Sequence, residues 1–296
     1  MEKLRVFSCF SGVGGSEKGI LDAAKATGTE VEIVGCSEID KFATTVYRRH
    51  FPKVREYGDI RGIRGEELPE FNCLTAGFCC QSHSVIGRRG GLTDAKGQLI
   101  FDVFRILRAK RPRIVCLENV KGILSSDNGV AFKQIVTELD ELGYDLQWQM
   151  LNASFFGTPQ KRERIIIVGF LRPEPAPQIF PIRTLAEASK TVLSDNVAVS
   201  YSKTRDKMTI GNTVNTITAN YRGLGQYNEP GIAYGSRIRR LTPLESERLQ
   251  MFPDNWTAYG ADGKAISDTR RYAMMGNAVC TTVMQAVFEQ ILLSLK

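Results

Sequence analysis

The sequence has few of the residues and segments that mark metal-binding, membrane or secreted proteins. Only two histidines, His50 and His83, occur among 296 residues, which leaves little material for a metal site. No stretch approaches the ~18 apolar residues of a membrane span, and the N-terminus has no apolar signal core. We therefore expect no bound metal, no membrane association and a location in the cytoplasm.

The sequence also lacks the pattern of a disulfide framework and a strong charge of either sign. The seven cysteines are odd in number and scattered through apparent strands and loops, which suits a reducing compartment. Lysine and arginine total 39 against 32 acidic residues, so the formal net charge is +7 and the pI is about 9.0. This mild basic excess favours a polyanionic partner such as nucleic acid. The length suits one large domain that carries a smaller one, or two modest domains.

A glycine-rich turn near the N-terminus is typical of nucleotide-binding units. The apolar run 4–10 predicts a strand, Ser11-Gly-Val-Gly-Gly15 predicts a tight turn, and a helical pattern follows through Leu21. The dinucleotide fingerprint requires another glycine at the position of Glu17, and an anionic side chain at the turn would repel a pyrophosphate. The pattern favours a ligand without phosphates, with a plain strand-to-helix connection as the alternative.

A carboxylate follows the second predicted strand. The run 31–37 reads as a strand and ends at Glu38. A carboxylate at this strand end can accept hydrogen bonds from both hydroxyls of a ribose. Together with the glycine turn, Glu38 predicts binding of an adenosine group.

Two adjacent cysteines stand in a loop that follows another predicted strand. The run 72–76 ends at Gly77, and Cys79 and Cys80 come shortly after it. Adjacent cysteines pair only with a strained backbone, and neither has a Cys-x-x-Cys spacing, so a nucleophile is one interpretation. Two small buried hydrophobic residues are the other. A cysteine hydrolase is disfavoured because His83 is only a sequence neighbour of Cys80.

Strands alternate with helices through the first 170 residues. Helical patterns cover 42–51, 99–107 and 132–142, and strand patterns cover 113–117, 146–151 and 165–170. Further helices are predicted over 242–252 and through Leu292. The alternation predicts a doubly wound α/β domain. Glu118 directly follows a mostly apolar strand, where a carboxylate is costly without a partner or a function.

Residues 171–236 differ in composition from the segment before them. Three prolines within 172–177 mark a linker, and Ser, Thr, Asn and Gly then separate short β-like runs such as 197–201. Residues 213–221 form a strand or loop whose polar side chains suit contacts to base edges. We expect a small second domain that is mostly β or irregular.

Six short motifs occur in a fixed order along the chain. They are Phe10-Ser-Gly-Val-Gly-Gly15, Cys80-Gln81, Glu118-Asn-Val120, Gln160-Lys-Arg-Glu-Arg164, Arg240-Leu-Thr-Pro243 and Gly276-Asn-Ala-Val279. Their order and spacing closely resemble those of the cytosine-5 DNA methyltransferase family, bacterial or phage type, over residues 4–170 and about 237–290. One position departs from the family, because its loop reads Pro-Cys-Gln and Cys79 stands here in place of the proline.

The resemblance implies the cofactor S-adenosyl-L-methionine and a set of residues around it. The implied cofactor-binding residues are Phe10, Gly12, Gly14, Glu38, Ile39, Asp59, Ile60, Leu99, Asn277 and Val279. The implied catalytic residues are Cys80 as nucleophile, Glu118 beside ring nitrogen N3 of cytosine, Gln81 as support of the loop, and Arg162 and Arg164 at the extruded nucleotide. The basic loop 87–91 is implied to close over DNA, and no metal is required.

The resemblance also implies a domain organisation and partners. Residues 1–170 would form a Rossmann-like catalytic domain, 171–262 the target-recognition domain, and 263–296 a segment that returns to the catalytic domain. The expected chain is a monomer that acts on double-stranded DNA in a bacterial or phage-infected cell, with a cognate restriction endonuclease as a further partner. Two alternatives stay open. They are an RNA cytosine methyltransferase on the same scaffold, and a catalytically impaired DNA-binding relative, since the loop lacks its proline.

Overall fold

The structure is a computed structural model that describes residues 3–78, 98–182, 197–202, 207–211, 213–219, 221, 230–234 and 237–296. Several predicted residues lie outside these ranges, namely Cys79, Cys80, Gln81, His83 and the basic loop 87–91. Within the described ranges, every helix is too short or too polar to span a bilayer.

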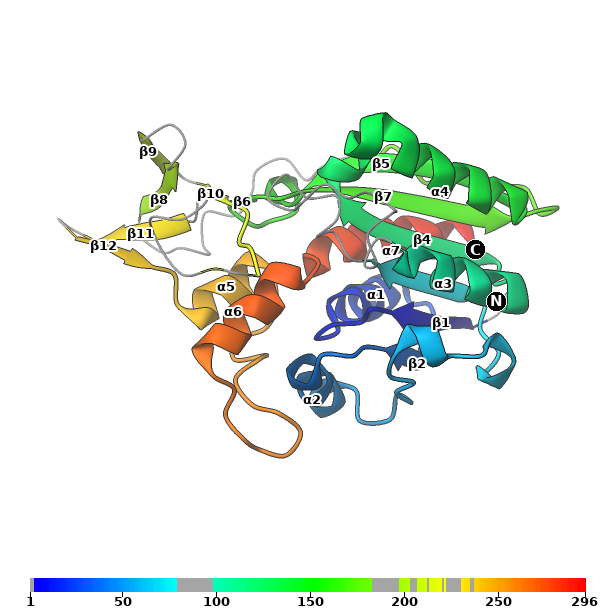
Figure 1. The fold of residues 1–296 in the computed structure, drawn as a ribbon, viewed down its shortest axis with the longest axis horizontal. Helices are drawn as coiled ribbons and strands as arrows, with labels where there is room; N and C mark the ends of the chain where they lie inside the picture. Colours follow the sequence, from blue (N-terminus) through cyan, green and yellow to red (C-terminus); the bar gives the residue numbers. More distant parts are fainter. Residues whose placement is uncertain are drawn as a thin grey trace.

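A six-stranded sheet forms the centre of the larger part of the molecule (Figure 1). In spatial order its strands are β2 (Val31–Ser37), β1 (Leu4–Cys9), β3 (Cys73–Gly77), β4 (Ile114–Val120), β7 (Glu163–Leu171) and β5 (Tyr144–Asn152). The first four are parallel, whereas β7 is antiparallel to both β4 and β5. The strand predicted at 165–170 is therefore β7, and it lies inside the sheet between β4 and β5.

Helices cover both faces of this sheet (Figure 1). They are α1 (Gly15–Thr27), α2 (Lys41–His50), α3 (Leu99–Lys110), α4 (Val130–Glu141) and α7 (Thr281–Ser294). On one face Ile20 of α1 and Phe288 of α7 pack in an apolar cluster with Val6 of β1. On the other face Phe104 of α3 and Ile135 of α4 belong to a second apolar cluster. This two-sided packing confirms the predicted doubly wound α/β domain.

The helices α1 and α7 approach each other closely. A Cβ atom on Gly19 would lie 2.5 Å from the carbonyl oxygen of Thr281, a distance that real side chains do not adopt. Glycine is therefore required at this crossing, where the beginning of α7 meets the middle of α1. Residues far apart in the sequence thus share one face of the sheet.

A smaller, mostly β part lies to one side of the central sheet (Figure 1). Its four-stranded antiparallel sheet has the order β12 (Arg237–Arg240), β11 (Pro230–Tyr234), β8 (Val197–Ser202) and β9 (Lys207–Gly211). The short strand β10 (Val214–Asn215) pairs with β6 (Gln160–Lys161), which begins the motif 160–164. The small, mostly β second part that the sequence predicted is present.

Two helices connect this part with the first one. The helix α5 (Pro243–Leu249) begins with a capping box between Thr242 and Glu245 and has Pro243 as its first residue, as predicted. The helix α6 (Asp268–Asn277) precedes α7 and was not predicted, because Gly276 and Asn277 are weak helix formers. Extended backbone at Ala278 and Cys280 keeps α6 and α7 separate.

Candidate functional site

The turn between β1 and α1 has a backbone that requires glycine. Gly12 and Gly14 have φ values of 56° and 87°, and a Cβ atom on Gly14 would lie 2.2 Å from Cε2 of Phe51. A Cβ on Gly12 would meet no atom within 4 Å, so this side of the turn is open. The turn is therefore an open backbone cradle at the place where the sequence predicts a ligand.

Glu38 at the end of β2 holds this turn. Its Oε2 accepts a hydrogen bond from Gly12 N at 2.8 Å, and its Oε1 accepts two, from Ile39 N and Asp40 N, each at 2.8 Å. A carboxylate oxygen has two lone pairs, so one lone pair of Oε2 remains to accept a hydrogen bond from a ribose hydroxyl. The side chain of Ile39 is 65% exposed next to it and offers an apolar surface to a ring.

The residues predicted at the edge of the adenine ring follow a segment that runs beside β2, where Ser37 Oγ donates to the carbonyl oxygen of Gly58 at 2.7 Å. Asp59 precedes the short helix η1 (Ile60–Gly62), and hydrogen bonds from Arg61 hold the pKa of Asp59 below its usual range. The side chain of Ile60 is buried and belongs to the core. Phe10 and Leu99 pack against the same apolar cluster as Ile60, so these three predicted residues share one face of the sheet.

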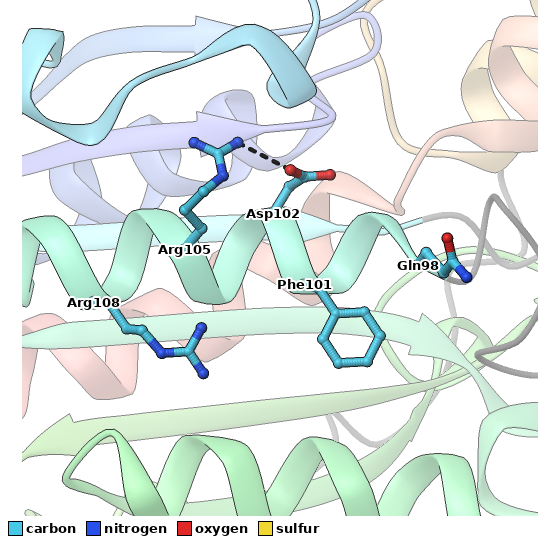
Figure 2. A pocket seen from close by; sticks show the side chains of 5 residues that line it. All are labelled: Gln98, Phe101, Asp102, Arg105 and Arg108. Carbon is cyan, nitrogen blue, oxygen red and sulfur yellow. Dashed lines mark hydrogen bonds and ion pairs between the residues drawn. The ribbon is translucent and has the colours of Figure 1, made fainter.

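A surface pocket runs along α3 and is shown in Figure 2. It is lined by Gln98, Phe101, Asp102, Arg105 and Arg108. Arg105 pairs with Asp102 at 2.9 Å and donates to the carbonyl oxygens of Ile60, at 2.8 Å, and Ile63. Arg108 pairs with Glu138 of α4. Both arginines of the pocket are thus paired within the protein, and Arg105 fastens η1 to α3.

The segment between α6 and α7 reaches the glycine turn. A Cβ atom on Gly15 would lie 3.1 Å from Cγ1 of Val279 and 3.1 Å from Cζ of Phe252, so both side chains press against the start of α1. Asn277 ends α6 with an exposed side chain two residues earlier. The structure therefore places Val279 beside the predicted cofactor turn.

An ion pair stands at the ends of the central strands. Glu118 of β4 pairs in register with Gly77 of β3, and Arg164 of β7 approaches it from the other side. Arg164 Nε lies 2.8 Å from Glu118 Oε1, and the two side chains are only 12% and 16% exposed. Glu118 Oε2 lies 3.4 Å from the Cβ position of Gly77, which is three residues before Cys80. The carboxylate thus stands where the cysteine loop leaves the sheet.

Asn119 is a further residue at this position for which the sequence indicated no role. Its side chain is buried, and its Nδ2 donates to the carbonyl oxygen of Phe78 at 3.3 Å. Phe78 is the last described residue before the two cysteines. Asn119 therefore fixes the direction in which the loop leaves β3. Its position directly after Glu118 is the only sequence signal that could have suggested this.

Arg162 has a different environment from Arg164. It is 2% exposed, and its guanidinium donates to the carbonyl oxygens of Ile217 at 3.3 Å, Gly276 at 3.1 Å and Ala278 at 2.6 Å. The sequence analysis expects Arg162 at the extruded nucleotide, and in the structure its side chain lies in the interior. Its contacts instead join the smaller part, α6 and the segment before α7.

Glu17 does not present its charge to the turn as the sequence suggested. Its side chain is fully buried, and burial raises the pKa of its carboxyl to about 7, while the hydroxyls of Ser8 and Tyr47 oppose this shift. The helical phase of α1 turns Glu17 inwards, so its carboxyl group is not exposed at the surface of the turn. Among the described residues, no group of three or more His, Cys, Asp or Glu side chains could hold a metal ion.

Comparison with known proteins decides the family. The profile of the C-5 cytosine-specific DNA methylases matches residues 4–217 and 183–293, which together span most of the chain. The chain belongs to this family.

Bacterial relatives of the methylase are similar along almost its whole length. It is 34% identical over 320 aligned positions to the Type II methyltransferase M.Bsp6I of Bacillus sp. (strain RFL6), which covers 97% of this chain and 98% of the relative. It is 33% identical to the Type II methyltransferase M.NlaX of Neisseria lactamica, covering 97% and 96%. The methylase is therefore a DNA cytosine methyltransferase.

Solved structures show the same fold at lower sequence identity. The methyltransferase EhMeth of Entamoeba histolytica superposes with a TM-score of 0.77 at 18% identity and covers both chains completely. The Dnmt2 methyltransferase of S. pombe gives a TM-score of 0.75 at 18% identity over 99% of this chain and 100% of the other. The methylase thus shares with them the Rossmann-like sheet and the smaller second part.

Proposed function

We propose that this methylase transfers a methyl group from S-adenosyl-L-methionine to carbon 5 of a cytosine in a specific duplex DNA sequence. The observation that carries the proposal is the ion pair of Glu118 and Arg164 beside Gly77, at the point where the loop with Cys80 leaves β3. A carboxyl group beside the strand end that precedes a cysteine in the sequence suits addition to a cytosine ring. The glycine turn at the end of β1 opens at the same edge of the sheet.

S-adenosyl-L-methionine fits the residues of the glycine turn. A hydroxyl of its ribose suits the remaining lone pair of Glu38 Oε2, and the open side of Gly12 leaves space for the methionine portion. Ile39 offers its exposed side chain to the adenine ring, and Val279 borders the turn from the C-terminal segment. When bound, the cofactor supplies an electrophilic methyl group.

We expect Glu38→Ala to weaken binding of S-adenosyl-L-methionine by about ten- to hundredfold, because a charged hydrogen-bond partner contributes about 1.5–3 kcal/mol. Titration calorimetry without DNA measures the dissociation constant. Glu32→Ala is a matched control, because Glu32 lies on the same strand and pairs with Lys3 away from the turn. Equal affinity in the two variants would contradict the role of Glu38.

The chemistry requires a nucleophile before the methyl group can be transferred. Carbon 5 of cytosine is a poor nucleophile until the thiolate of Cys80 forms a bond to carbon 6. This addition pushes electron density towards N3, where the carboxyl group of Glu118 donates a proton or a hydrogen bond. Carbon 5 would then bond to the methyl group while the bond between this group and the sulfonium sulfur breaks, with S-adenosyl-L-homocysteine as the leaving group. A base removes the carbon 5 proton, and cleavage of the bond between sulfur and carbon 6 restores the ring and frees Cys80.

Residues around Glu118 and Cys80 prepare these groups. Arg164 fixes one oxygen of Glu118 at 2.8 Å and so directs the other towards the cysteine loop. Asn119 holds the carbonyl of Phe78, the last described residue before that loop. For Gln81 we keep the supporting role that the family resemblance implies. Turning a cytosine out of the duplex costs a few kcal/mol, which contacts to the DNA backbone must offset.

We propose that residues 1–170 form the catalytic domain, 171–262 the target-recognition domain, and 263–296 the segment that returns to the first. The antiparallel sheet of β8, β9, β11 and β12 gives the second range a scaffold of its own, joined to the first through the pairing of β6 with β10. The motifs of the catalytic part are shared by the whole family. We therefore propose that the DNA target sequence is determined by the other part of the chain.

Replacing residues 171–236 by the corresponding segment of a methylase with another target should move methylation to that target. The physical reason is that this range contributes strands β8 to β11 and the polar segment 213–221, while Glu118 and the cofactor turn stay unchanged. Bisulfite sequencing of DNA from the expressing host gives the pattern. An active chimera that keeps the original pattern would show that specificity resides elsewhere.

The proposed reaction itself is tested by expressing the chain in a host that lacks cytosine methylation. Bisulfite sequencing should reveal 5-methylcytosine at one recurring DNA sequence. Methylation of the host's RNA with unmodified DNA would overturn the proposal in favour of an RNA substrate.

We also propose that the chain acts as a monomer, with a restriction endonuclease of the same target as its cellular counterpart, as the Type II relatives suggest.

A further inference from the structure

The carbonyl group in the middle of the glycine turn is held by a tryptophan from a distant part of the chain. Nε1 of Trp256 donates a hydrogen bond to the carbonyl oxygen of Val13 at 2.9 Å. The same peptide unit donates through Gly14 N to the carbonyl oxygen of Ser11 at 2.9 Å. The orientation of the Val13–Gly14 peptide is therefore fixed on both sides, one of them by Trp256.

The indole ring of Trp256 is itself tightly held. It stacks on the imidazole of His50 with ring centres 3.5 Å apart and planes within 4° of each other. Nε2 of His50 lies 2.8 Å from the carbonyl oxygen of Trp256, so side chain and backbone are fixed together. Phe51 and Phe252 pack against the same indole, and the tryptophan is only 8% exposed.

The backbone around Trp256 is fixed by a buried carboxylate. Glu247 at the end of α5 is fully buried and accepts hydrogen bonds from Asn255 N at 2.8 Å and Thr257 N at 2.9 Å. Arg271 of α6 neutralises it at 3.0 Å. Asn255 and Thr257, the two neighbours of Trp256, are thereby held to α5 and α6. The backbone that carries the indole is therefore fixed.

We propose that Trp256 is a positioning residue for S-adenosyl-L-methionine, and that its indole N–H sets the shape of the glycine turn and hence the affinity for the cofactor. The inference rests on the proposed function of that turn. Glu38 holds the turn at Gly12 N from the side of β2, and Trp256 holds it at the Val13 carbonyl from the opposite part of the chain. A turn fixed at both points need not be ordered when the cofactor binds.

Loss of the indole N–H leaves the Val13 carbonyl without its partner and allows its peptide to rotate. The cofactor must then order the turn on binding, so we expect Trp256→Phe to raise the dissociation constant for S-adenosyl-L-homocysteine about tenfold. The KM for S-adenosyl-L-methionine should rise by a similar factor, while kcat at saturating cofactor stays within about twofold, since Trp256 touches no reacting group.

The chain offers a matched control, because it contains only two tryptophans. Trp148 lies on β5, is 48% exposed and contacts Phe132, away from the turn. Trp148→Phe should bind S-adenosyl-L-homocysteine as the wild type does in titration calorimetry. Measuring the unfolding temperatures of the wild type, Trp256→Phe and Trp148→Phe identifies a temperature at which all three are folded, and binding is compared at that temperature.

Trp148→Phe also provides a measurement that leaves position 256 intact. Trp256 is then the sole tryptophan, and its fluorescence should change on addition of S-adenosyl-L-homocysteine and saturate at the calorimetric dissociation constant. Binding without any change in emission, or equal affinity of Trp256→Phe and wild type, would overturn the role of Trp256 alone. Absence of binding in all three proteins would overturn the proposed cofactor and this inference with it.

Discussion

Duplex DNA that carries 5-fluorocytosine in its target sequence is expected to become covalently attached to the wild-type methylase, and to remain free with Cys80→Ser. Fluorine at carbon 5 cannot leave as the proton does, so the bond between the Cys80 sulfur and carbon 6 persists after methyl transfer. A serine hydroxyl is a far weaker nucleophile at neutral pH, and methylation of ordinary DNA should fall on the order of 10⁴-fold or more. Denaturing gel electrophoresis shows the adduct.

Cys79 supplies the control for this experiment. It occupies the position at which the family has proline, whose ring fixes φ near −65°. Both Cys79→Pro and Cys79→Ser should still form the adduct, because we propose Cys80 as the sole nucleophile. An adduct that survives in Cys80→Ser and disappears in Cys79→Ser would transfer the role to Cys79. No adduct in any of these proteins would point to a DNA-binding relative without activity.

Glu118→Gln is expected to lower kcat by about 10²- to 10⁴-fold, because an amide cannot donate the proton that stabilises the ring once the thiolate has added. Arg164 would remain in place but lose the carboxylate that it pairs with at 2.8 Å. Single-turnover methylation of a labelled duplex measures the rate of the chemical step. Affinity for S-adenosyl-L-homocysteine should be unchanged, because Glu38 and the glycine turn are not altered.

Glu163→Gln is the matched control for Glu118→Gln. Glu163 also pairs with a cation, Lys121 at 3.1 Å, but both side chains are largely exposed, and such a pair contributes little. This variant should methylate at the wild-type rate. If Glu118→Gln and Glu163→Gln behaved alike, the carboxyl group at the end of β4 would have no part in the reaction.

Much of the sheet and its strand ends could be predicted from the sequence, because each strand is a short apolar run that stops at a polar or glycine residue. The run 31–37 became β2 with the same bounds, and Glu38 follows its end, as expected. Glu118 was expected directly after a strand that ends at residue 117, whereas β4 extends to Val120 and contains it, because β7 pairs with these last residues. Local signals suffice for such features, since hydrophobic pattern and turn residues act over a few positions. The order of the strands in the sheet could not be predicted in the same way, because it depends on contacts between distant segments.

The environments of the two arginines show where local reasoning fails. Arg162 and Arg164 belong to one motif, yet one is buried among backbone carbonyls and the other pairs with Glu118. The carbonyl partners of Arg162 lie 55, 114 and 116 residues further along the chain. No spacing within the motif encodes these contacts, because they exist only after the smaller part and the last two helices have docked.

The close crossing of α1 and α7 has a consequence for the synthesis of the protein. A growing chain contains β1 and α1 long before the ribosome reaches α7. The apolar surface around Val6 and Ile20 therefore stays exposed until α7 has been synthesised. Such unfinished surfaces attract chaperones and promote aggregation. A chain interrupted before Thr281 is therefore not a smaller methylase but an incomplete domain.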